Sequence, residues 1–232
     1  MNRLAVVSVA VLGIGGWGSV HAAQIVQQLS TSNAIDAPIN SSPAYNSSSY
    51  YNYIGMAEST LVTNVLYRFD LPAIPGGSTI NSATFSIWKF DDGNITQTAD
   101  VHAITKDWTN SVTYSTYDGT NPWSSSGMGS GTDYEAAVTA TVAFNAPGWH
   151  DIDITSQYQQ WFSGAEANYG LVLIPTTLDN QYTRLAATEP VPPNTEPFGL
   201  QLTVDYTPVP EPTSLGLLCV AGLLGLRRRR KA

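Results

Sequence analysis

The sequence has little cysteine, little histidine and few basic residues, and each shortage excludes a class of chemistry. Its one cysteine, Cys219, lies in an apolar run near the C-terminus, so the region before it has no disulfide and no thiol chemistry. The three histidines have no Ser/His/Asp or metal-ligand spacing around them. The stability of the central region must therefore come from burial of a core, or from a bound ion.

Basic residues are scarce in the central region of the chain. Six of the ten lie at the two ends of the chain, at Arg3 and over residues 227–231. The region between them keeps four cations against all 18 acidic residues, a formal charge of −14. Such a surface repels nucleic acid and polyanionic sugars, so it favours neutral glycans or calcium as partners.

The two ends carry targeting signals. A basic start, an apolar run over residues 4–14 and small residues around Val20-His21-Ala22 predict a signal peptide, residues 1–22, as an N-terminal helix that is cut after Ala22. At the other end, residues 208–232 contain an apolar helix over 213–226 followed by five cations. Fourteen residues span about 21 Å as a helix, against about 30 Å of hydrocarbon. This length favours transient insertion into the inner membrane, with an ordinary permanent anchor as the alternative, and everything before Val209 is expected outside.

The C-terminal residues also carry a resemblance. Pro210, Glu211 and Pro212, the Leu/Gly-rich run and Arg227, Arg228, Arg229 and Arg230 resemble a PEP-CTERM sorting signal. The resemblance implies processing by an exosortase-type enzyme in a Gram-negative bacterium. It also implies release to the cell surface or into extracellular polymer.

Residues 24–207 read as one all-β domain. Tyr, Thr, Val and Ile are abundant, and Gly, Pro, Ser and Asn interrupt them at short intervals. We expect an antiparallel two-sheet β-sandwich of jelly-roll type. Long loops are expected over residues 40–52 and 108–136. Strands are expected over 60–71, 82–90, 99–105, 138–144, 149–154, 169–174 and 200–206, with one short helix over 156–163.

Several segments of this domain resemble a known family. They are Tyr67-Arg68-Phe69-Asp70-Leu71-Pro72, residues 80–88, Trp108-Thr109, Asp153-Ile154-Thr155, residues 161–164 and Asn168-Tyr169-Gly170-Leu171. Their order over residues 30–206 resembles the DNRLRE domain, which is similar to carbohydrate-binding module family 96. The polar signature of that family is reduced here to Leu185-Ala186-Ala187-Thr188-Glu189-Pro190, and no acidic residue follows Trp108 within residues 109–114. The resemblance implies a β-sandwich with a glycan role, and it does not supply the ligand.

Aromatic residues in loops are the candidates for glycan binding, because ring faces stack on sugars. Tyr114, Tyr117 and Trp123 lie in the Gly/Ser-rich loop, and Tyr51 lies with Tyr45, Tyr50 and Tyr53 in the N-terminal loop. Packing in the core or at a sheet edge is the alternative for each. Trp88, Trp108 and Trp161 are expected in the core.

Acidic residues suggest two further possibilities. Asp91, Asp92 and Asn94 offer oxygen ligands for calcium in a turn, with a plain polar turn as the alternative. Arg68 and Asp70 are expected to form a structural pair at a sheet edge, or to belong to a partly buried network. Asp107, Asp151 and Asp153 are the carboxylates of a rival hypothesis, a polysaccharide lyase or glycoside hydrolase.

The hypothesis that these observations favour is an exported, non-catalytic protein without a required cofactor that binds, or resides in, extracellular polysaccharide. A purely structural protein of the biofilm matrix is the third possibility.

Overall fold

The computed structural model describes residues 8–10, 21–41, 50–57, 61–90, 95–190 and 199–209. The rest of the predicted signal peptide, the sorting segment from Pro210 onward and the calcium candidates Asp91, Asp92 and Asn94 lie outside these ranges. Within them, no helix is long and apolar enough to cross a membrane.

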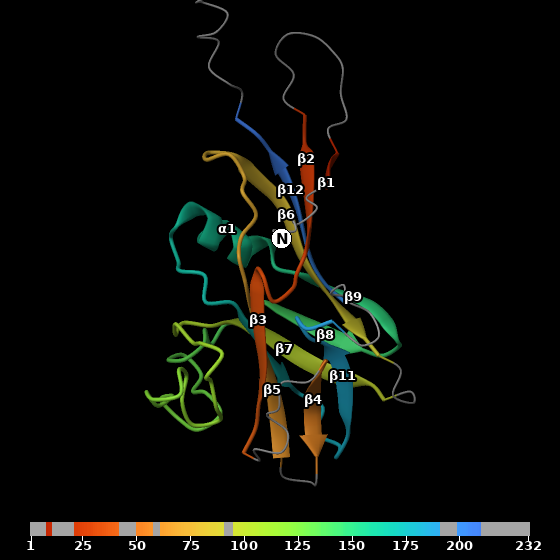
Figure 1. The fold of residues 1–232 in the computed structure, drawn as a ribbon, viewed down its shortest axis with the longest axis vertical. Coiled ribbons are helices and arrows are strands. Elements are labelled where there is room, and N and C mark those ends of the chain that lie inside the picture. The colour runs from red at the N-terminus through yellow and green to blue at the C-terminus, as the bar shows by residue number, and fades with distance from the viewer. Residues whose placement is uncertain are drawn as a thin grey trace, which may run out of the picture.

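Strands dominate the described residues, which confirms the prediction of an all-β fold. The described ranges contain twelve strands and one helix. Figure 1 shows how they are arranged. They are β1 (Ser8–Ala10), β2 (Ala23–Gln28), β3 (Ala34–Ile39), β4 (Tyr51–Ala57), β5 (Leu61–Phe69), β6 (Thr79–Lys89), β7 (Gln97–Ala103), β8 (Ala140–Phe144), β9 (Gly148–Asp153), α1 (Thr155–Ser163), β10 (Leu171–Pro175), β11 (Tyr182–Ala186) and β12 (Leu200–Thr207).

All strand pairings are antiparallel, and together they link the strands into one continuous sheet. One half is centred on β6, which pairs with β12, β9 and β11, while β12 also pairs with β2. The other half is centred on β5, which pairs with β3, β4 and β10, and β7 and β8 follow β10. The β4–β11 pairing connects the two halves.

The main core lies where the two halves face each other. The ring of Phe85 on β6 lies 5.4 Å from that of Tyr67 and 5.2 Å from that of Phe69, both on β5. No ladder joins β5 to β6, so these contacts are made between sheet faces. The expected alternation of β12 is present, with Leu200, Leu202 and Val204 buried.

Helix α1 matches the helix predicted over 156–163 and begins one residue earlier. Tyr158 and Trp161 are buried against the core, and Phe162 packs partly against it. The helix ends at Gly164, whose φ of 75° is a left-handed conformation that glycine adopts without strain.

Two expectations need correction. Residues 8–10, expected within a signal helix, form strand β1, and Ser8 lies opposite Val26 of β2. The expected exposed loop over 40–52 ends in strand β4, and both of its terminal asparagines are buried. Asn40 donates to the Thr63 hydroxyl at 2.9 Å, which explains why a polar residue is tolerated inside.

Candidate functional site

The long loop between β7 and β8, residues 104–139, folds over the outer face of the β5 half of the sheet. It forms the yellow-green coil beside β3 and β7 in Figure 1. A second core lies beneath it, made of Ile39, Leu66, Ile104, Trp108, Trp123, Met128 and Val172. The loop contributes two of the six tryptophans of the chain to this core, which gives an otherwise irregular segment a fixed position.

This packing determines how far the aromatic residues predicted to bind glycans are exposed. Trp123 is 4% exposed, and its indole N–H donates to the Thr113 carbonyl at 2.9 Å. The Tyr117 ring lies 5.7 Å from the Trp123 ring, and Tyr114 is half-buried with its ring against Gly127. The structure thus corrects the expectation for Trp123: its ring belongs to the second core and offers no free face for a sugar.

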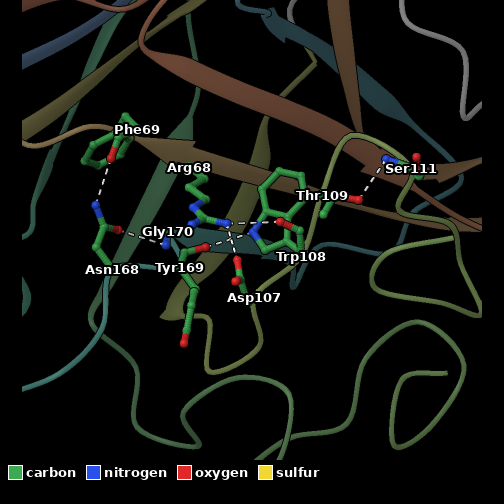
Figure 2. Close-up of polar contacts among 9 residues, drawn as sticks. All are labelled: Arg68, Phe69, Asp107, Trp108, Thr109, Ser111, Asn168, Tyr169 and Gly170. Carbon is green, nitrogen blue, oxygen red and sulfur yellow. Dashed lines mark hydrogen bonds and ion pairs between the residues drawn. The ribbon is translucent and has the colours of Figure 1, made fainter. Parts of the chain in front are cut away.

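A polar network fixes the base of the loop (Figure 2). The Arg68 guanidinium donates to the Asp107 carboxylate at 2.6 Å and to the Trp108 carbonyl at 3.1 Å. The Trp108 indole N–H donates to the Tyr169 carbonyl at 2.8 Å. The partner of Arg68 is thus Asp107 and not Asp70, which corrects the expected pair.

The Asn-Tyr-Gly segment completes this network. The Asn168 amide donates to the Phe69 carbonyl at 2.7 Å and accepts the backbone N–H of Gly170 at 3.0 Å (Figure 2). Gly170 has a φ of 85°, and a Cβ there would overlap the Tyr67 carbonyl. The segments on which the family resemblance rests therefore hold strands and loop together.

Strands β4 and β11 carry a different group of aromatic residues. Tyr51 and Tyr53 occupy alternate positions of β4, and Tyr182 and Arg184 occupy alternate positions of β11. The register of the ladder places all four on the same face of the sheet. The rings of Tyr53 and Tyr182 meet edge to face, 5.1 Å apart, and the Arg184 guanidinium lies 5.3 Å from the centre of the Tyr51 ring. We call Tyr51, Tyr53, Tyr182 and Arg184 the tyrosine face.

A pocket of 500 Å³ opens beside the tyrosine face. Tyr182, one of its walls, is 42% exposed. The loop before β11 comes close to β4 here, because the Met56 N–H donates to the Gln181 carbonyl at 2.9 Å. Gly55 permits this approach, since a side chain at that position would overlap the same carbonyl. The lining residues are Tyr53, Ile95, Asn180, Gln181, Tyr182 and Arg184.

The sequence predicted two of the four residues of the tyrosine face. It named Tyr51 and Tyr53, although as loop residues, and it missed Tyr182 and Arg184 because no strand was expected over 182–186. The signal was present as a short alternation, since Thr183 and Leu185 are buried while Tyr182 is exposed and Arg184 half-buried.

A half-buried carboxyl group, that of Asp36, lies near the start of the domain. Asp36 accepts the Thr188 backbone N–H at 2.7 Å and the Asn52 amide at 2.6 Å. Burial raises the pKa of Asp36, and burial together with the nearby charge of Asp36 raises the pKa of Glu189. Because their pKa values are raised, both acids take up protons more readily than they would in water. Asp36, Thr188 and Glu189 line a pocket of 200 Å³.

The carboxylates of the rival enzyme hypothesis have structural partners. Asp107 binds Arg68, and Asp151 accepts the Ser86 hydroxyl at 2.6 Å. Asp153 accepts the backbone N–H and the hydroxyl of Thr155, and these hydrogen bonds lower the pKa of Asp153. A general acid needs a raised pKa, so Asp153 does not suit that role.

His102 and His150 each bind backbone carbonyls. The Nδ1 of His102 lies 2.9 Å from the Glu135 carbonyl and 3.0 Å from that of Ala137, so this nitrogen carries the proton. His150 binds the Ala146 carbonyl through Nε2. Among the residues that the structure describes, no three His, Cys, Asp or Glu side chains gather as a metal site.

Comparison with protein families identifies the class of the chain first. A model of the PEP-CTERM protein-sorting motif matches residues 208–231, which marks the chain as an exported protein that an exosortase sorts. A model described as TGF-beta propeptide matches residues 30–190, more than half of the chain. The chain belongs to the TGF-beta propeptide family. No curated protein matches it.

The family match covers the region where a DNRLRE domain was expected. The resemblance to that domain, and to carbohydrate-binding module family 96, is therefore not shown and stays a hypothesis. The sorting prediction is confirmed by the match to the PEP-CTERM motif, which begins at Pro208 and ends at Lys231.

Proposed function

We propose that this protein binds extracellular polysaccharide without cleaving it, and resides in that material after export. The observation that carries the proposal is the placement of aromatic rings on outward faces of strands. Tyr182 on β11 is 42% exposed, and its ring lies in contact with the ring of Tyr53 on β4. Exposed ring faces of this kind suit sugars.

The engaged carboxylates support binding over catalysis. Asp107, Asp151 and Asp153 each hold a neighbouring segment of the chain, as described above. The formal charge of −14 over residues 4–226 also opposes nucleic acid as a partner.

The proposal includes the organisation of the chain. A signal peptide over residues 1–22 is removed, and residues 24–207 form one β-sandwich domain of jelly-roll type that resembles the DNRLRE domain. The contacts between Phe85 and the rings of β5 support two packed layers. The hydrophobic segment over 213–226 inserts transiently into the inner membrane before exosortase cleavage.

Two measurements test the proposal. Replacement of Pro210, Glu211 and Pro212 by alanine should leave an uncut precursor in the membrane fraction, and normal release would contradict the sorting step. The purified protein should be retarded in native gels that contain hydroxyethylcellulose or galactomannan, two neutral polysaccharides. Migration that neither polymer changes would contradict the binding function. Shortening of either polymer by the protein would show catalysis instead.

A further inference from the structure

Among the residues that the structure describes, Trp149 on β9 and Tyr182 on β11 are exposed aromatic residues within strands, and they differ in their surroundings. Trp149 meets Trp88 edge to face with the ring centres 5.7 Å apart, on a strand where Asp151 and Asp153 share its face. The tyrosine face instead borders a pocket of 500 Å³ whose lining combines two phenol rings, two amides and one guanidinium. Rings beside hydrogen-bonding groups in a concave surface are what a sugar chain needs.

We infer that the tyrosine face is the polysaccharide site, and that its ligand is a neutral sugar chain bound through Tyr53 and Tyr182. This inference rests on the proposed function and assigns it to residues. The two rings meet at 84°, so they form adjacent walls at a right angle and not one flat platform. A sugar ring stacks on the exposed Tyr182 face while the neighbouring sugar contacts the Tyr53 wall.

The polar lining supplies groups for sugar hydroxyls. Asn180 and Gln181 carry amides that both donate and accept, and the Arg184 guanidinium donates only. Arg184 lies over the Tyr51 ring, a contact that holds the guanidinium and its neighbour Tyr53 in place. Tyr51 thus acts as a positioning residue beside Tyr53, the other tyrosine of β4 predicted to bind glycans.

Charge selects between neutral and acidic sugars. Arg184 is one cation in a region that carries a formal charge of −14. A polymer with an acid on each sugar would meet this negative field over the whole length that it covers, whereas a neutral chain would not. The site therefore favours neutral polysaccharide.

The pocket owes its shape to Gly55. This residue has a φ of 129°, lies opposite Tyr182 in the ladder and leaves room for the backbone of Gln181. The approach places Gln181 and Tyr182 at the wall of the pocket. The backbone, and not a mobile side chain, thereby sets the distance between the two walls.

The test compares Tyr182→Ala and Tyr53→Ala with Trp149→Ala by affinity electrophoresis in hydroxyethylcellulose, galactomannan and polygalacturonate. Trp149 is a matched control because its exposure, 43%, equals that of Tyr182 within one per cent. We expect each tyrosine variant to raise the Kd for a neutral polymer at least about tenfold, which corresponds to about 1.4 kcal/mol. Trp149→Ala should bind as the wild type does.

The outcomes separate the site from the function. Wild-type binding that both tyrosine variants retain would overturn the site and leave the function intact, and loss in Trp149→Ala alone would move the site to β9. Stronger retardation by polygalacturonate than by the neutral polymers would overturn the neutral ligand. Absence of wild-type binding to either neutral polymer would defeat the proposed function itself. If Tyr53→Ala does not fold, as judged by thermal unfolding, the exposed Tyr182→Ala carries the test.

Discussion

The tryptophans of the 104–139 loop turn inward, whereas Tyr182 of β11 remains at the surface. The loop lies on the apolar side chains of Leu66 and Val172, and Trp123 covers them because the loop has no other core. Tyr182 occupies an outward position of a strand whose other face is already filled by Thr183 and Leu185. The comparison shows that the exposure of a ring depends on whether its side of the segment faces a core or the solvent. It does not depend on whether the segment is a strand or a loop.

The largest expected effect concerns the inward group. Trp123→Ala should lower the free energy of unfolding by about 3–5 kcal/mol, because a fully packed indole leaves a cavity. Urea denaturation measures the change. The matched control is Trp149→Ala, which removes an equally large but exposed ring and should cost far less. Equal costs for the two variants would break the comparison.

The next effect concerns the backbone under the tyrosine face. Gly55→Ala should destabilise the protein by more than the strain of about 1–3 kcal/mol that a left-handed residue carries, because its Cβ overlaps the Gln181 carbonyl. Gly148→Ala is the control, since Gly148 has nearly the same φ, 128°, and open space around it. Thermal unfolding of both variants isolates the contact, and equal losses would show that Gly55 is required for its φ alone.

A pH series distinguishes the half-buried Asp36 from the exposed Asp153. The pKa of Asp36 is raised by burial, so its contribution to stability is present below its ordinary pKa and is lost as the pH rises through the raised value. The pKa of Asp153 is lowered by Thr155, so its contribution is present above its ordinary pKa and is lost as the pH falls.

Replacement of each acid by asparagine should show these opposite trends in urea unfolding between pH 3 and 7. The cost of Asp36→Asn, about 1–3 kcal/mol for disturbed buried hydrogen bonds, should shrink as the pH rises. The cost of Asp153→Asn should grow as the pH rises. Parallel pH profiles for the two variants would contradict the assigned directions.

The smallest expected effect is on the outward group. Tyr182→Ala should change the free energy of unfolding by at most about 0.5 kcal/mol, as is usual for exposed positions. Tyr117→Ala, from the loop, should cost more because Tyr117 packs against Trp123. Chemical denaturation of this pair sharpens the comparison, since both variants remove the same side chain.

Composition and alternation were sufficient to predict the all-β class, the helix ending at Gly164 and seven of the strands. They did not predict β1, β2, β3, β4 or β11. Pro38 interrupts the pattern of β3, and β11 is only five residues long. The partner of Arg68 also escaped prediction, because Asp70 is near in sequence while Asp107 becomes near only when the loop folds back. Asp36 and Glu189 escaped for the same reason, since they come together only when β3 meets the segment after β11, where the Thr188 N–H donates to Asp36.

The loop over 104–139 leaves and re-enters the sheet at neighbouring points. Val101 lies opposite Ala140, and the Thr139 N–H donates to the Val101 carbonyl at 2.8 Å. A segment whose ends meet in this way can change in length over evolution without shifting the register of β7 and β8. Related chains are thus free to vary here in size, provided that whatever replaces the loop still covers Leu66 and Val172.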